Sequence, residues 1–419
     1  MSRNQYIFSI ASLVNGISFS MILPLLAPII RQLKLSELQG GAMVSAGALF
    51  MAIAAIYLSK HQSKYSIYQL LVIGFVGMSL TWAIFSGVLL YSMNSTLTVI
   101  SIFLLLLIAR AATGIFMAMP QIALQTYVMT AFKSETIRSQ TMSKFGALNS
   151  FGIIIGPFLT TLFLVGGIQM PLWIAVLLLA LVSLLIMTMY ERQNDPSQIK
   201  SFTQNNVDQL STNQSTVEDS TLSIKPILFW LILGFYLYLA IVTLNLTAGF
   251  YIQDHFKIDI HNSAVLFSQC SLIVGVSLVS MQIMISKYLK CSVYQLLTMG
   301  IVAMAIGLIM SIYTDHLRVF QAAYIFYGIA VACFIPAFTT GAAQKAPQHL
   351  QGKVAGWCTA TQALSFVIGP LISTGLYQWH APLPYYFLIF GLLLLAIYAV
   401  FSRYTTSQIQ PQDLKKKVV

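Results

Sequence analysis

A single arginine stands deep inside one of the longest apolar stretches of the sequence. Arg110 follows the start of the run 98–129 by about 12 residues, which is about 18 Å along a helix that rises about 1.5 Å per residue. A charge at that depth costs about 2.5–3.5 kcal/mol on insertion scales, and such residues usually face a wet cavity or a partner. The arginine therefore predicts a fixed cation in a cavity wall. The alternative is an arginine that packs between helices and donates to backbone carbonyls.

Other polar and aromatic side chains recur at helical spacing and are candidate cavity residues. On the helical face of Arg110, at steps of three or four, lie Thr113, Met117, Gln121 and Leu124. Further polar candidates in other apolar runs are Asn15, Ser18, Tyr238 and Asn245. An aromatic stripe in a later run consists of Tyr324, Tyr327, Val331, Phe334 and Phe338. Such a stripe more often packs than binds, so both interpretations stay open.

Carboxylates are missing from the interior of the apolar runs. Glu37 and Asp254 stand at the ends of runs, and the other acidic residues lie in connecting segments. A buried cation without a buried anion favours a neutral or negatively charged ligand. If protons are coupled to binding, they must use Arg110, Asp254, His255 or Glu37, or the ligand's own ionisation. The four cysteines and six histidines show no spacing typical of a metal site, a disulfide framework or a catalytic cluster.

The composition requires that these residues sit in membrane-spanning helices. Of the 419 residues, 58% are hydrophobic and only 8% are charged, which excludes a soluble enzyme and a disordered chain. A helix needs about 20 apolar residues to cross the bilayer. Twelve runs qualify: 6–30, 38–58, 67–91, 98–129, 140–166, 169–190, 226–252, 263–286, 293–313, 319–343, 353–378 and 383–402. We therefore expect an all-α membrane protein with a six-helix bundle over 1–190, a flexible polar linker over 191–225, a second bundle over 226–404 and a basic tail over 405–419.

The distribution of basic residues predicts the orientation. Seventeen of the 22 Lys and Arg residues lie at the termini or in segments on the same side, whereas four lie in the opposite loops. Because cytoplasmic loops carry the excess of Lys and Arg, both termini are expected in the cytoplasm. The net charge of +11 therefore reflects topology, and no nucleic-acid partner is expected.

The two halves look like copies of one another. Ser66-Ile-Tyr-Gln-Leu-Leu opens the third run and Ser292-Val-Tyr-Gln-Leu-Leu opens the ninth. A second match, offset by 213 residues, pairs Asn149 with Gln362 and Gly152-x-x-x-Gly156-Pro157 with Ser365-x-x-x-Gly369-Pro370. In the fourth and tenth runs, Gly114 and Pro120 correspond to Gly328 and Pro336. Two homologous halves predict a pseudo-two-fold axis with a binding site between the halves, and the paired Gly-Pro sequences predict bent, closely packed gate helices.

Several of these motifs resemble the major facilitator superfamily, and within it the twelve-span drug:proton antiporter branch. Leu106-x-x-x-Arg110-x-x-x-Gly114 is similar to a signature of the fourth span, in which the arginine is implicated in proton coupling. The Gly152–Pro157 sequence is similar to the antiporter signature of the fifth span, although Thr160-Thr161 replaces its closing Gly-Gly. The loop 56–64 lacks both glycines and the aspartate that are usual between the second and third spans. The resemblance implies that spans one, four, seven and ten line a cavity.

Together these features predict a secondary active transporter of the bacterial inner membrane, not an enzyme. We expect a functional monomer that works by alternating access, uses the proton gradient with no bound cofactor or metal, and exports a small amphipathic neutral or anionic compound. One alternative is a dedicated exporter of a secreted metabolite, such as a carboxylate-bearing siderophore. Two other classes of protein are the remaining alternatives. A polytopic membrane enzyme would need clustered His, Cys or carboxylate side chains at membrane depth. A non-transporting membrane protein would leave Arg110 and the paired hinges without a function.

Overall fold

The structure is a computed structural model that describes residues 3–60, 65–94, 97–131, 135–191, 226–289, 291–345 and 351–413. This part of the chain is helical, with no strand, as expected for an all-α protein. The α-helices are α1 (Arg3–Met21), α2 (Leu26–Gln32), α3 (Glu37–Lys60), α4 (Ile67–Asn94), α5 (Val99–Ala131), α6 (Glu135–Phe163), α7 (Met170–Met189), α9 (Leu228–Phe256), α10 (Ile260–Lys287), α11 (Val293–Tyr313), α12 (Leu317–Gln344), α13 (Gln351–Trp379) and α14 (Leu383–Asp413). The predicted linker lies outside the described residues apart from position 191, and so do positions 414–419 of the predicted tail.

Most helices lie within a few residues of the predicted runs, but two differ in length or continuity. The run 6–30 was expected to be continuous, whereas the structure divides it into α1, a 3₁₀ turn (Leu23–Leu25) and α2. The break has a physical cause, since Pro24 has no N–H to donate to the preceding turn. The last helix continues past residue 404 to Asp413, so the described part of the predicted tail is helical.

The side chains on the outside of the bundle are those of a membrane protein. Ten helical segments among the described residues are long and apolar enough to cross a membrane, when α1, the 3₁₀ turn and α2 are counted together as the first span. Two further long helices, α13 and α14, complete the bundle. Their exposed faces carry large hydrophobic side chains such as Leu80, Ile100 and Ile108. Such a surface would aggregate in water and is stable in lipid. The chain is a multi-pass membrane protein.

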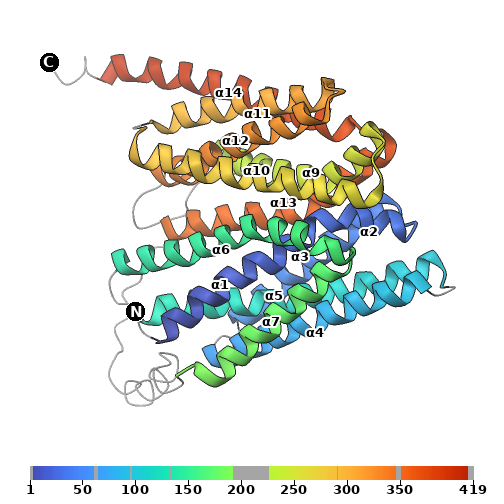
Figure 1. Ribbon diagram of the computed structural model, residues 1–419. Coiled ribbons are helices and arrows are strands. Elements are labelled where there is room, and N and C mark those ends of the chain that lie inside the picture. Colours follow the sequence, from blue (N-terminus) through green and yellow to red (C-terminus); the bar gives the residue numbers. More distant parts are fainter. Residues whose placement is uncertain are drawn as a thin grey trace, which may run out of the picture.

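Helices α1–α7 and helices α9–α14 form two halves that lie one above the other in Figure 1. We call the end of the molecule where α1 begins and α7 ends the terminal end, and the opposite end, where α2 joins α3, the distal end. Arg3 and Glu191 form an ion pair of 3.7 Å at the terminal end. Figure 1 shows the last described residues of α14 on the same side of the picture as the start of α1.

The internal repeat is visible in the local structure of the two halves. Ser66 accepts a hydrogen bond from the backbone of Gln69, whose side chain accepts one from the backbone of Ser66, so this pair starts α4 with a capping box. Ser292 and Gln295 start α11 in the same way. The matching sequence motifs therefore produce matching helix starts.

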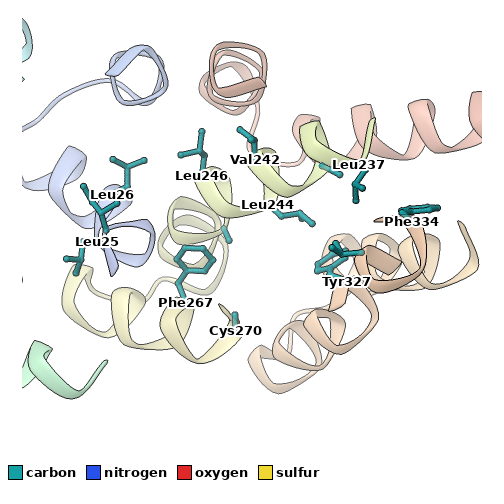
Figure 2. Close-up of a cluster of buried hydrophobic side chains, with 14 of the residues drawn as sticks. Leu25, Leu26, Leu237, Val242, Leu244, Leu246, Phe267, Cys270, Tyr327 and Phe334 are labelled. Atoms are coloured by element: carbon teal, nitrogen blue, oxygen red, sulfur yellow. The ribbon is translucent and has the colours of Figure 1, made fainter. Parts of the chain in front are cut away.

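The two halves touch through equivalent pairs of helices. In one pair, α6 packs on α10, where a Cβ added at Gly275 would lie 2.7 Å from the side chain of Ile154. In the other pair, α13 packs on α3, where a Cβ added at Gly41 would lie 2.6 Å from the carbonyl oxygen of Pro370. These close approaches lie between mid-depth and the distal end of the bundle. Figure 2 shows Leu25 and Leu26 of the first span in one buried cluster with Phe267 of α10, which again joins the halves near the distal end.

Candidate functional site

Each half contains a cavity, and the two cavities occupy equivalent places in the repeat. Cavity 1, of about 210 Å³, is lined by residues of α1, α4, α5 and α6. Cavity 2, of about 360 Å³, is lined by residues of α9, α12 and α13. These helices are the first, third, fourth and fifth spans of one half and the first, fourth and fifth of the other. Asn149 lines cavity 1 and Gln362 lines cavity 2, as the offset between the repeats predicts.

Cavity 1 combines side-chain amides with aromatic rings. Its described lining consists of Phe8, Ala11, Ser12, Asn15, Leu71, Phe75, Pro120, Gln121, Leu124, Gln125, Phe145, Gly146 and Asn149. The amide nitrogen of Asn15 donates to the amide oxygen of Asn149 over 3.3 Å. The candidates Asn15 and Gln121 both line cavity 1, whose described lining comes from the first half alone, whereas the repeat predicted a binding site between the halves.

Cavity 2 has fewer amides and more hydroxyl and thiol groups. Its described lining consists of Tyr238, Phe338, Thr339, Ala343, Val354, Cys358, Thr359 and Gln362. Tyr238 is the predicted candidate that contributes here, and its ring packs against Phe338 and Phe366. Both cavities lie toward the terminal end, since their lining residues stand in the first half of α9 and α13, in the second half of α5 and α12, and no deeper than the middle of α6.

At the distal end, one arginine joins the two halves. A terminal nitrogen of Arg31 lies 2.7 Å from a carboxylate oxygen of Asp254 on α9 and 2.8 Å from a carboxylate oxygen of Glu37 on α3. The hydroxyl of Tyr377 on α13 donates to the same oxygen of Asp254, also at 2.7 Å. The guanidinium also lies over the ring of Phe250, 5.5 Å from its centre. We call Arg31, Glu37, Asp254 and Tyr377 the distal cluster.

Sequence reasoning singled out Asp254 and Glu37 but counted Arg31 only as a loop charge. The cluster was not foreseen because its central pair is separated by 223 positions in the chain. The available signal was that a base and two acids all stand at the distal ends of their spans. A nearby carboxylate, Asp259, accepts hydrogen bonds from the backbone and side chain of Asn262, and these bonds hold the pKa of Asp259 below its ordinary value.

Arg110 is buried but lines neither cavity. The residue is 8% exposed, and its guanidinium carbon lies 5.1 Å from the centre of the Trp82 ring on α4. Its Nε atom has no hydrogen-bond partner, and no carboxylate in the described part of the chain forms an ion pair with it. The arginine therefore points into its own half and away from lipid. Its predicted part in substrate binding and proton coupling stays a prediction.

The other candidates on the face of Arg110 separate along α5. Thr113 is fully buried and donates to the carbonyl of Ala109, and Met117 is partly buried against the hydrophobic core. Only the later positions of this face, from Gln121 onward, reach cavity 1. On α9, Asn245 donates to the carbonyl of Ile241 over 2.7 Å and is absent from the described lining of both cavities.

The aromatic stripe of α12 corrects the predicted placement. Tyr324, Tyr327 and Phe334 were candidates for the cavity wall, but all three are buried in the packed interior of the second half. The physical reason lies in α11, where Gly307 and Gly300 leave room for the rings of Tyr327 and Phe334. The hydroxyl of Tyr327 is 2.7 Å from that of Ser311 and donates to the carbonyl of Gly307. Figure 2 shows Tyr327 and Phe334 in a buried cluster with leucines of α9. Of the five stripe residues, only Phe338 reaches cavity 2.

The candidate hinge residues lie on the helices that pack most closely. Gly152 and Gly156 of α6 sit against the backbone of α1, so a Cβ at Gly156 would lie 2.8 Å from the carbonyl oxygen of Ile17. Gly114 of α5 is pressed against the backbone of Gly47 on α3. The surroundings of Gly369 are looser, because a Cβ there would lie 3.2 Å from the nearest atom, a methyl carbon of Leu239.

The two prolines lie within the two helices that contact the opposite half. Pro157 is inside α6, three residues from the Ile154 contact with α10, and Pro370 is itself the contact of α13 with Gly41. One departure from the antiporter signature has a visible consequence. The hydroxyl of Thr160 donates to the carbonyl of Met21, at the break in the first span, over 2.9 Å.

Comparison with known proteins decides the family. The sequence profile described as Major Facilitator Superfamily matches residues 8–291 and 288–417, which together are nearly the whole chain. The chain belongs to this superfamily. Its members are membrane transporters, so the chain is a secondary transporter by family, and its described residues form ten apolar spans and further helices in the fold of this superfamily. A search of curated protein sequences finds no match.

Several solved structures share the fold of this superfamily member. The D-xylose–proton symporter gives a TM-score of 0.71 at 15% identity, covering 95% of this chain and 96% of that one. The nucleoside transporter NupG gives 0.67 at 14%, covering 97% and 98%. The human organic anion transporter MFSD10 gives 0.62 at 15%, covering 95% and 99%. At such identities the likeness concerns the fold alone.

Proposed function

We propose that this transporter exports a small amphipathic compound, neutral or anionic, in exchange for protons. It resides in the bacterial inner membrane as a monomer, with both termini in the cytoplasm, and belongs to the drug:proton antiporter-like branch of the superfamily. It needs no bound cofactor, since the proton gradient supplies the energy. Substrate enters the cavities from the cytoplasm, which is the terminal end, and leaves at the distal end.

The proposal rests on a difference between the two ends of the molecule: the halves are joined at the distal end, and the cavities lie toward the terminal end. The Arg31–Asp254 ion pair joins the halves at the distal end, whereas both cavities lie toward the terminal end. A chain in this state accepts a ligand from the terminal side and holds the distal side closed. Alternating access requires that the distal pair break and that the halves close at the terminal end.

The distal cluster offers a way to couple this change to protons. Asp254 and Glu37 share one guanidinium, so protonation of Asp254 removes the charge that holds Arg31 to the second half. The pair loses its charge-assisted character, and the distal end opens more readily. In this proposal a proton enters Asp254 from outside while substrate leaves, and it departs toward the cytoplasm after the halves rock back.

The proposed substrate charge follows from the buried groups. Arg110 is the one cation at mid-depth in the sequence, and the described linings of both cavities contain no Asp or Glu. A cationic drug would find no countercharge there, a neutral compound needs none, and Arg110 is the mid-depth group whose charge attracts an anion. The proposed direction of transport rests on the Gly-Pro sequence of α6, which resembles the signature of exporters.

Uptake into inverted membrane vesicles tests the proposal, because export from the cell becomes uptake there. Fluorescein serves as an anionic probe, Nile red as a neutral one and ethidium as a cationic one. We expect uptake of the anionic or neutral probe that stops when a protonophore collapses the gradient, and loss of this uptake in Arg110→Ala. Arg318→Ala, which removes an arginine from the distal start of α12, is the matched control and keeps full uptake. Ethidium uptake as fast as that of the other probes, together with a harmless Arg110→Ala, would overturn the proposal.

Drug-susceptibility profiling of a deletion strain addresses the dedicated-exporter alternative. A multidrug exporter predicts increased sensitivity to several unrelated compounds. A dedicated exporter predicts unchanged susceptibility together with the loss of one compound from the culture medium.

A further inference from the structure

We propose that cavity 1 recognises an uncharged aryl amide, or a lactam of the same shape, through the paired side chains of Asn15 and Asn149. This inference rests on the proposed transport function and deepens it, since it assigns the chemical class of ligand and the atoms that bind it.

The two asparagines leave the oxygen of Asn15 and the amino group of Asn149 without a hydrogen bond to each other. A side-chain amide has one oxygen that accepts and one nitrogen that donates two hydrogen bonds. Asn15 spends one N–H on the oxygen of Asn149. The oxygen of Asn15 and the nitrogen of Asn149 then remain for a ligand, and both side chains line cavity 1 and are only half-buried. An acceptor and a donor therefore stand next to each other at the cavity wall.

A neutral amide edge is the complement of this pair. A carboxamide or lactam presents an N–H beside a C=O, so the N–H can donate to Asn15 while the C=O accepts from Asn149. A carboxylate has no proton for Asn15, and an amidinium has no lone pair for Asn149. In either case one polar group at the cavity wall is left without a partner, which costs about a factor of ten in affinity.

The rest of the cavity fits a flat, uncharged ring. The described lining contains no Lys, Arg, His, Asp or Glu. Three buried aromatic rings, those of Phe8, Phe75 and Phe145, form part of the wall. Phe8 lies 5.9 Å from Phe145 between ring centres, so the aromatic surface there is continuous. At about 210 Å³, cavity 1 is below the usual range of about 300–1,000 Å³ for drug-sized ligands, so it suits one ring with one amide.

The equivalent cavity lacks this arrangement. In cavity 2 the described lining has a single side-chain amide, Gln362, at the position equivalent to Asn149. The residue of cavity 2 on the first span of its half is Tyr238, a phenol and not an amide. The donor–acceptor pair is therefore a property of the first half alone among the described residues, and it orients a ligand with its amide toward that half.

Four molecules of nearly the same shape test the proposal on purified full-length protein in nanodiscs. They are benzamide, benzoate, benzamidinium and N,N-dimethylbenzamide, which differ in charge and in the number of N–H groups. We measure the shift in unfolding temperature with each probe at equal millimolar concentration and derive the dissociation constants. Benzamide is expected to bind about tenfold more tightly than the other three, since only benzamide satisfies both asparagines. Equal shifts by all four probes, or stronger binding of benzoate, would overturn the proposal.

A substitution that changes the donor into an acceptor gives a sharper result. In Asn149→Asp, the carboxylate still accepts from Asn15 but offers a second acceptor in place of the donor. This variant is expected to prefer benzamidinium over benzamide by about tenfold, which is a reversal and not a mere loss. Because a reversal requires a folded protein, an unfolded variant cannot imitate it. If Asn149→Asp folds poorly, Asn149→Leu replaces it and is expected to bind benzamide no better than benzoate.

The chain supplies a matched control in a second pair of amides. Gln321 donates to Gln269 over 2.9 Å between α10 and α12; Gln269 is exposed, Gln321 is half-buried, and both lie outside the described linings. Gln269→Glu makes the same chemical change there and is expected to leave the preference for benzamide unchanged. A reversal in the control as well would overturn the proposal. Since binding is measured without transport, amide binding with no vesicle uptake rejects only the proposed function, and uptake without amide preference rejects only this inference.

Discussion

Arg31 and Asp254 stand 2.7 Å apart although 223 positions separate them in the chain, and each belongs to a different half. Their pair joins the halves at the distal end, where Tyr377 supports Asp254 and Glu37 supports Arg31. The side chains of Arg31 and Asp254 are 33% and 39% exposed, so water screens the interaction. A pair of this kind holds one state by a small margin and can be broken during each transport cycle.

Removing the charge of Asp254 is expected to open the distal end more often. We expect Asp254→Asn to weaken the contact between the halves at the distal end by about 0.5–1 kcal/mol, which corresponds to a two- to fivefold change in the population of the open state. Pulsed electron spin resonance between labels at Gln32→Cys and His261→Cys, in a background where Cys291 and Cys358 are serine, reports the separation of the halves. The long-distance population is expected to grow. Asp315→Asn, which removes an almost fully exposed carboxylate next to His255, is the control and leaves the distribution unchanged.

A disulfide across the same end is expected to stop transport. A Cβ added at Gly249 on α9 would lie 2.7 Å from the Cβ of Ala27 on α2, so a separation of about 1 Å more gives the spacing that a disulfide needs. The double variant Ala27→Cys/Gly249→Cys should lose vesicle uptake on oxidation and regain it with a reductant. The vesicle uptake of each single variant should be the same with and without the oxidant. Full uptake with the disulfide formed would show that the distal end need not open.

The two glycines that match in the repeat are expected to respond differently to alanine. Gly156→Ala places a Cβ against the backbone of α1, including the Ile17 carbonyl, and should destabilise the protein by about 1–3 kcal/mol. Gly369→Ala meets only flexible side-chain atoms of α9 and should change stability by less than about 1 kcal/mol. Thermal unfolding in detergent compares the two. Equal effects would contradict the unequal packing of the two halves.

Arg110 is expected to lower the stability of the fold although transport requires it. Its Nε has no partner and its neighbour is the Trp82 ring, so replacement by an apolar side chain of similar length relieves an unpaired buried charge. Arg110→Met should therefore retain or raise the unfolding temperature by the equivalent of up to about 3 kcal/mol, and it should abolish uptake. A fall in unfolding temperature would instead identify Arg110 as a packing residue, the alternative left open by the sequence.

The sequence predicted the helices better than the directions of their side chains. The run 293–313 coincides with α11, because apolar length alone determines a span. The break in the first span was missed, although Pro24 was the available signal. The sequence left open whether the aromatic stripe of α12 packs or lines a cavity, because periodicity cannot tell which neighbour a face meets. Glycines 300 and 307 on α11 decided that Phe334 and Tyr327 pack inward.

The candidate site was predicted in part for a similar reason. The candidates Asn15, Gln121 and Tyr238 line cavities, but the described lining of each cavity comes from one half, whereas the repeat predicted a site between the halves. Arg31 was missed because its importance comes from a contact between the halves, and nothing local to residues 26–32 indicates which residue of the other half stands opposite. Such pairings depend on how two bundles dock, which spacing along the chain does not encode.

The side of the membrane from which Cys358 can be labelled tests most directly the central claim that the cavities open at the terminal end while the distal end is closed. This thiol lines cavity 2, whereas Cys270 and Cys333 are buried. In a Cys291→Ser background, a membrane-impermeant maleimide is added to sealed vesicles of either orientation, and labelling of Cys358 is followed over time. The account predicts rapid labelling from the terminal side, negligible labelling from the distal side, and slower terminal-side labelling in Asp254→Asn. Equal labelling from both sides, or a rate indifferent to Asp254→Asn, would contradict it.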